Sequence, residues 1–91
     1  MNGIILTEFF SKLCPFCQKQ NKILDELEKG FIGKVEFIRI DIDDNRDLLK
    51  GFEIDGVPTL LILKNDNILK KYIGLTQKEE LESAINKALL S

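Results

Sequence analysis

The sequence predicts an α/β protein in which one mixed sheet of four strands is flanked by about three helices. Two apolar segments of strand length are separated by a segment whose apolar residues have helical spacing. Two further strand-like segments are joined by a polar turn, which is typical of a hairpin, and a second helical segment follows them. The strands of a strand–helix–strand unit are parallel and those of a hairpin are antiparallel, so the sheet should be mixed.

The first half of the chain predicts a strand, a helix and a second strand. Residues 4–10 are rich in β-branched, aromatic and aliphatic side chains, which indicates a buried strand. Pro15 suits the first position of a helix, and Gly30 is expected to end it. Residues 35–42 alternate apolar and polar and predict the second strand. The buried face of the helix should contain Cys17, Gln20 or Asn21, Ile23, Leu24 and Leu27.

The second half predicts a short helix and a hairpin. A polar, turn-like segment at residues 41–45 precedes a short helix over residues 46–52. An apolar strand at residues 60–63 should then pair with a strand at residues 68–73, because the polar residues 65–67 form a turn between them.

A last helix is expected after Gly74, which interrupts the second strand of the hairpin. Thr76 is followed three residues later by Glu79, which predicts a capping box at the start of this helix. One face of the helix should be apolar and should contain Leu81, Ala84, Ile85, Ala88 and Leu89.

Length and composition predict one soluble globular domain over residues 1–91, with 44% hydrophobic and 31% charged residues. The net charge is −2 and the charges are interleaved, so nucleic acid is not an expected partner. The apolar runs are too short to span a bilayer, and no signal-peptide pattern is visible at the start. We therefore expect a cytoplasmic, monomeric protein with no membrane association.

The strongest chemical signal is the segment Cys14-Pro15-Phe16-Cys17, which lies between the first strand and the first helix. A disulfide across so short a loop stabilises little, so reactivity is the better reason for the pair. A thiolate attacks disulfides, and the positive end of a helix dipole stabilises negative sulfur. Cys14, at the cap, is the expected nucleophile. Cys17, one turn inside the helix, is expected to resolve the mixed disulfide.

Other roles for the cysteines are weaker but open. The chain contains no histidine, which excludes Cys/His zinc sites and a Cys–His nucleophilic pair within it. Two thiols make only half of a four-thiolate site, so a metal or cluster would require a dimer. Two buried core cysteines are the remaining alternative. Asp41, Asp43 and Asp44 match no calcium loop and predict a solvated turn, so no metal and no cofactor are expected.

Four segments, in this order, resemble the thioredoxin family: residues 9–17, Arg39-Ile40-Asp41-Ile42-Asp43, Gly56-Val57-Pro58-Thr59, and Gly74. The resemblance covers nearly the whole chain, apart from an N-terminal strand and helix that full-length thioredoxins carry. It implies the thioredoxin fold and a protein disulfide oxidoreductase that reduces protein disulfides by dithiol–disulfide exchange. A thioredoxin reductase or glutathione would supply its electrons.

The chain also departs from the thioredoxin pattern. Leu13 stands where thioredoxins usually have Trp, and the dipeptide between the cysteines is Pro-Phe rather than Gly-Pro. Pro-Phe is closer to the Pro-Tyr of dithiol glutaredoxins, whereas Gly74-Leu75-Thr76 replaces the Gly-Gly of their glutathione site. We therefore expect a short, glutaredoxin-sized thioredoxin, with a glutathione-linked glutaredoxin-like enzyme as the alternative.

The resemblance also implies a substrate-binding loop at Val57 and Pro58. From the spacing alone, Pro58 could be a cis residue or an ordinary trans residue at the start of a strand. The family pattern implies that it is cis, so that the Val57 backbone faces an extended substrate segment. The other residues expected to contact substrate are Pro15, Phe16, Thr59 and Gly74.

Glu8 is a candidate for proton transfer. It lies six residues before Cys14 in an otherwise apolar strand, where desolvation would raise its pKa and let it exchange a proton with Cys17. The family carries a buried Asp at the matching place and often a Lys near the position of Arg39. The alternative is a strand residue that faces water, and the alternation of the strand does not decide between the two.

Overall fold

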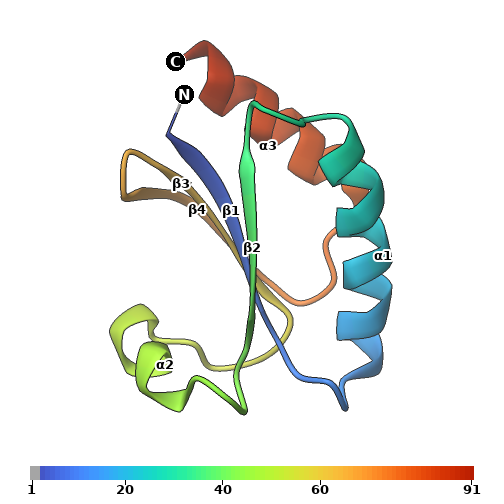
Figure 1. The fold of residues 1–91 in the computed structure, drawn as a ribbon, viewed down its shortest axis with the longest axis vertical. Helices are drawn as coiled ribbons and strands as arrows, with labels where there is room; N and C mark the ends of the chain where they lie inside the picture. Colours follow the sequence, from blue (N-terminus) through green and yellow to red (C-terminus); the bar gives the residue numbers. More distant parts are fainter. Residues whose placement is uncertain (1–2) are drawn as a thin grey trace.

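The computed structural model describes residues 3–91 and contains the elements in the order that the sequence predicts (Figure 1). The predicted bounds of the strands and of the short helix agree with the observed ones to within one residue. The elements are β1 (Ile4–Phe10), α1 (Pro15–Lys29), β2 (Glu36–Asp41), α2 (Arg46–Phe52), β3 (Thr59–Lys64), β4 (Asn67–Ile73) and α3 (Lys78–Leu90).

The four strands form one mixed sheet with the order β2-β1-β3-β4. β1 is parallel to β2 and antiparallel to β3, and β3 is antiparallel to β4. Helices α1 and α3 lie together on one face, and the short α2 lies on the other side (Figure 1). Within residues 3–91, no helix has both the length and the apolar character needed to cross a membrane.

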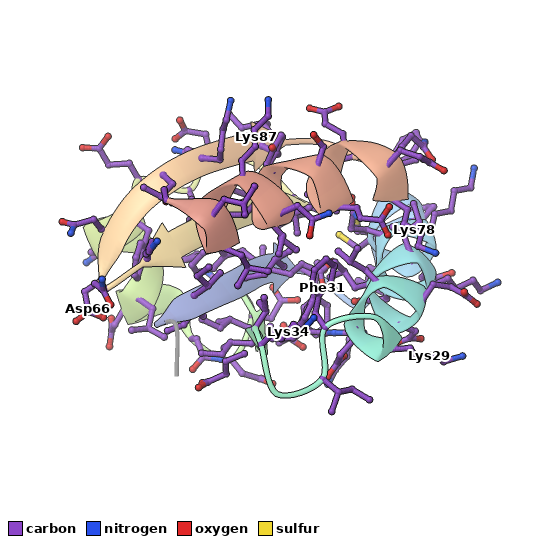
Figure 2. The ribbon with its side chains drawn as sticks, turned by 90° about the horizontal axis from the view of Figure 1, so that it is seen from above. Lys29, Phe31, Lys34, Asp66, Lys78 and Lys87 are labelled. Carbon is purple, nitrogen blue, oxygen red and sulfur yellow. The ribbon has the colours of Figure 1, made fainter. Side chains whose placement is uncertain are left out.

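The main core lies between the sheet and helices α1 and α3. Along β1, the buried Ile4 and Leu6 belong to this core. Phe31, just beyond α1, points into the same layer (Figure 2). The labelled Lys78 and Lys87 project outward. On the opposite face of the sheet, the ring of Phe9 packs at 5.5 Å against the ring of Phe52 from α2.

The apolar face predicted for α1 is confirmed. Of the two polar candidates at this face, Gln20 is fully buried and Asn21 is only half-buried. The buried residues of α1 are Cys17, Gln20, Leu24 and Leu27. Their spacing of three and four residues places the second cysteine of the motif on the same stripe as the core leucines.

The turn between β3 and β4 is tighter than predicted. Asn65 and Asp66 adopt left-handed backbone conformations with φ of 50° and 70°, and Asn67 already belongs to β4. Two consecutive residues with positive φ are typical of the two-residue hairpin turn, and Asn and Asp tolerate this conformation better than most residues.

The capping box predicted at Thr76 and Glu79 is wrong. α3 begins at Lys78, and Gln77 is its N-cap without a side-chain capping hydrogen bond. The Thr76 hydroxyl instead donates to the carbonyl of Gly74 at 3.1 Å. Both backbone groups of Thr76 are bound by a side chain of α1, so this residue stays outside the helix.

Candidate active site

Cys14 occupies the N-cap of α1 with an extended backbone conformation. Its own N–H donates to the carbonyl of Ser11 at 3.2 Å, which closes the turn after β1. Its Sγ accepts a hydrogen bond from the N–H of Cys17 at 3.0 Å. Pro15 follows at the first helical position, where no hydrogen bond is lost. A half-buried sulfur therefore faces the free N–H groups at the start of a helix, which stabilise negative charge.

Cys17 lies one turn inside α1 and is fully buried, and both cysteines are free thiols. Burial raises the pKa of Cys17 to about 12, and its hydrogen bond with Cys14 contributes in the same direction. The negative charges of Cys14 and Glu8 also raise this pKa, whereas a backbone hydrogen bond at Ser11 lowers it. The second thiol is therefore protonated at neutral pH.

The Val57–Pro58 peptide bond is cis, as predicted. The thiol of Cys14 donates to the carbonyl of Val57 at 3.9 Å, so the backbone before the proline lies beside the sulfur. The N–H of Gly74 donates to the carbonyl of Pro58 at 2.8 Å. The Thr59 hydroxyl turns inward and donates to the carbonyl of Gly56 at 2.6 Å.

Apolar side chains that remain in contact with water surround the motif. Phe16 is 58% exposed, as expected for a residue between the two cysteines, and the Nζ of Lys19 lies 5.6 Å from the centroid of its ring. Leu13, which directly precedes Cys14, is 90% exposed, and Pro15 is exposed too. Ile73, next to Gly74, is 68% exposed. These side chains leave apolar surface exposed near Cys14.

Glu8 is fully buried in β1, between Arg39 of β2 and Leu60 of β3. Neither carboxylate oxygen has a hydrogen-bond partner among residues 3–91. Burial raises the pKa of Glu8 to about 7, the positive charge of Arg39 opposes this rise, and Asp25 adds to it. Of the two interpretations of Glu8, the water-facing one is excluded by its burial.

The guanidinium of Arg39 is bound by three side chains of α1, a contact that the sequence pattern did not indicate. It donates to the carboxylate of Asp25 at 2.8 Å, to that of Glu28 at 3.3 Å, and to the amide oxygen of Asn21 at 3.4 Å. These three residues follow one another at intervals of four and three, so they share one helix face. Because α1 engages its guanidinium, Arg39 leaves the neighbouring Glu8 without an ion pair.

Gln20 is a second residue of the site region that the sequence did not assign to it. Its amide binds both backbone groups of Thr76 in the loop after β4. A polar residue within the apolar stripe of α1 is the only signal that could have indicated this role.

The structure thus brings most of the predicted site residues to one end of the sheet. Val57, Pro58 and Gly74 lie beside Cys14, with Cys17 beneath it in the helix. Glu8 is close enough to Cys17 for its charge to act on that thiol. A partly exposed sulfur next to a buried, protonated thiol is an arrangement that suits dithiol–disulfide exchange, and a carboxyl group that titrates near neutrality lies close to them.

The family model for thioredoxin matches residues 1–87. The chain belongs to the thioredoxin family. Thioredoxins are thiol–disulfide oxidoreductases, and the mixed four-stranded sheet with three helices described above is the thioredoxin fold.

Among the relatives, thioredoxin 2 of Plasmodium berghei is 43% identical over 88 residues, which are 97% of this chain and 56% of that protein. The chain thus spans about half the length of that thioredoxin. Thioredoxin of Bacillus subtilis is 30% identical, over 96% of this chain and 84% of its own length.

The thioredoxin fold is also supported by solved structures. A thioredoxin-2, described as a component of malaria parasite protein secretion machinery, superposes with a TM-score of 0.91 at 29% identity, covering 94% of this chain and 84% of its own. A structure described as a malarial protein gives a TM-score of 0.89 at 29% identity, covering 99% of this chain and all of its own.

The raised pKa of Glu8 predicts a pH-dependent cost in stability. In the unfolded chain Glu8 ionises near its ordinary value of 4.5, and in the folded protein near 7. Between these values the folded state binds more protons, so the free energy of unfolding decreases as pH rises through this window. Relative to Glu8→Gln, the wild type should lose up to about 3 kcal/mol between about pH 4.5 and pH 7, at about 1.4 kcal/mol per pKa unit.

Urea denaturation of both proteins across this pH range measures the difference. Glu26→Gln, which changes an exposed carboxylate on α1, is the matched control and should follow the wild type. Equal pH dependence in the wild type and in Glu8→Gln would show that Glu8 does not titrate in this window.

Proposed function

We propose that the protein reduces disulfide bonds in other proteins, with Cys14 as the nucleophile and Cys17 as the resolving thiol. The observation that supports this most is the contrast between the two sulfurs. Cys14 is only half-buried and caps the N-terminus of α1, whereas Cys17 is buried one turn away. Two adjacent thiols with such different surroundings suit two successive steps of exchange.

In the first step, the Cys14 thiolate attacks one sulfur of a substrate disulfide. A new bond joins Cys14 Sγ to that sulfur, the substrate S–S bond breaks, and the other substrate sulfur leaves as a thiolate. The free N–H groups of α1 stabilise the attacking anion. The Val57 backbone beside Cys14 can pair with the main chain of an extended substrate segment, which requires no particular substrate sequence.

In the second step, Cys17 attacks Cys14 Sγ and releases the reduced substrate. The Cys17 thiol must first lose its proton, because its pKa is about 12. Glu8 is unpaired, and its pKa of about 7 lets it accept that proton near neutral pH. The dithiol gives two electrons to the substrate and ends as the Cys14–Cys17 disulfide.

An external reductase or a small thiol must then supply two electrons to reduce this disulfide again. A thioredoxin reductase is the donor that we propose, because Gly74-Leu75-Thr76 replaces the Gly-Gly of a glutathione site. Comparing NADPH plus a thioredoxin reductase with glutathione as donors tests this choice. The cytoplasmic location and the monomeric state stay predictions.

The two roles of the cysteines can be separated with single variants. The wild type should reduce insulin disulfides when dithiothreitol is supplied. Cys17→Ser should accumulate a covalent adduct with the substrate, because Cys14 can still attack and nothing resolves the product. Cys14→Ser should form no such adduct. Intact-protein mass spectrometry with and without reductant measures both results.

The reverse pattern, with an adduct only in Cys14→Ser, would contradict the assignment of the two thiols. An inactive wild type that purifies as a zinc-containing or coloured dimer would instead support a binding module in which two chains share a metal or cluster.

Glu8→Gln should slow the release of substrate from the mixed disulfide by up to about a hundredfold near neutral pH. This is the lower end of the rate enhancement that a general base typically contributes. It should also flatten the pH dependence of this step around the pKa of Glu8, since the amide cannot titrate. Stopped-flow measurement of thiol release at several pH values checks this. An unchanged pH–rate profile would remove Glu8 from the mechanism.

A further inference from the structure

The amide of Gln20 binds the loop between β4 and α3 at two points. Its Nε2 donates to the carbonyl of Thr76 at 3.0 Å, and its Oε1 accepts from the N–H of Thr76 at 2.8 Å. Both residues are buried, with 0% and 6% of their surfaces exposed. The amide of Gln20 therefore satisfies both the N–H and the carbonyl of Thr76, in the way that the backbone of a neighbouring β-strand would.

Further hydrogen bonds connect Thr76 to the reactive sulfur. The Thr76 hydroxyl donates to the carbonyl of Gly74 at 3.1 Å, and the N–H of Gly74 donates to the carbonyl of Pro58 at 2.8 Å. The preceding residue, Val57, accepts from the thiol of Cys14 at 3.9 Å. The segment after β4 is thus bound to α1 on one side and to the proline loop on the other.

The chemistry of this contact requires an amide. A carboxylate cannot donate to the carbonyl of Thr76, and an apolar side chain would leave both backbone groups of Thr76 buried without partners. An apolar residue would otherwise suit this position, because Leu24 and Leu27 continue the same buried stripe. Gln20 therefore does more than fill space in the core.

We propose that Gln20 is a positioning residue for substrate binding: it fixes the Gly74–Thr76 segment against Pro58 and thereby holds the backbone of the proline loop beside Cys14. This inference rests on the proposed reduction of protein disulfides. A protein substrate would contact this backbone as well as the sulfur, whereas a small disulfide needs only the sulfur. Gln20 should therefore affect the two kinds of substrate differently.

The test compares Gln20→Met with the wild type on two substrates, insulin and the small disulfide dithiobisnitrobenzoate. For insulin, KM should rise roughly fivefold to tenfold with kcat nearly unchanged, the range expected when about one net hydrogen bond no longer supports the bound state. The rate with the small disulfide should stay within about twofold of the wild type, a difference too small to reflect one hydrogen bond. Gln77→Met is the matched control, because Gln77 is exposed and makes no capping hydrogen bond in the same loop.

Hydrogen–deuterium exchange provides a second measurement. The amides of Gly74 and Thr76 should exchange faster in Gln20→Met and remain protected in Gln77→Met. If Gln20→Met does not fold, Gln20→Asn takes its place, since its shorter side chain keeps the amide but cannot reach both groups of Thr76.

Two results would overturn the inference. An unchanged KM for insulin would show that the contact between Gln20 and Thr76 does not support substrate binding. An equal loss with both substrates would place the defect at the thiols. A wild type that reduces the small disulfide but not insulin would refute the proposed function itself, which distinguishes that failure from a failure of the Gln20 assignment.

Discussion

The hydrogen bond from the N–H of Cys17 to the sulfur of Cys14, 3.0 Å long, is the contact on which the rest of the site depends. Through this hydrogen bond the side chain of Cys14 caps α1, so the reactive sulfur lies directly at the start of the helix. Pro15 fixes the first turn without using a donor, and this leaves the N–H of Cys17 directed at the sulfur. The same turn buries Cys17 on the core side. The partial exposure of Cys14 and the burial of Cys17 thus both follow from the way in which α1 begins.

Burial then separates the protonation behaviour of the groups around the helix. Desolvation raises the pKa of Cys17 and that of Glu8, which lies in the same layer of the molecule. Glu8 would titrate lower if it formed an ion pair with Arg39, but α1 engages that guanidinium through Asp25 and Glu28. Asp25 and Glu28 on the surface of α1 therefore influence the pKa of the buried Glu8 by holding Arg39. An unpaired buried carboxyl group costs stability, and such costs are often found at functional sites.

The elements of the fold could be predicted because each is specified locally, by hydrophobic periodicity, by Pro15 and by turn residues. The errors arise where a tertiary contact overrides a local signal. Thr76 has the sequence context of a helix cap, but Gln20, 56 positions away, binds its backbone. The orientation of Glu8 could not be read from β1, because apolar residues lie on both of its faces. The engagement of Arg39 by α1 is likewise invisible in the sequence, since only the fold brings β2 beside that helix.

Alkylation of the reduced protein tests the central claim most directly. The protein would be treated with a limiting amount of iodoacetamide near neutral pH, digested, and analysed by mass spectrometry to find which cysteine reacted. A partly exposed sulfur at the N-cap of α1 and a buried, protonated thiol predict modification of Cys14 at least about tenfold faster than of Cys17, because the thiolate is the reactive form. Equal rates at the two cysteines, or faster modification of Cys17, would contradict the account.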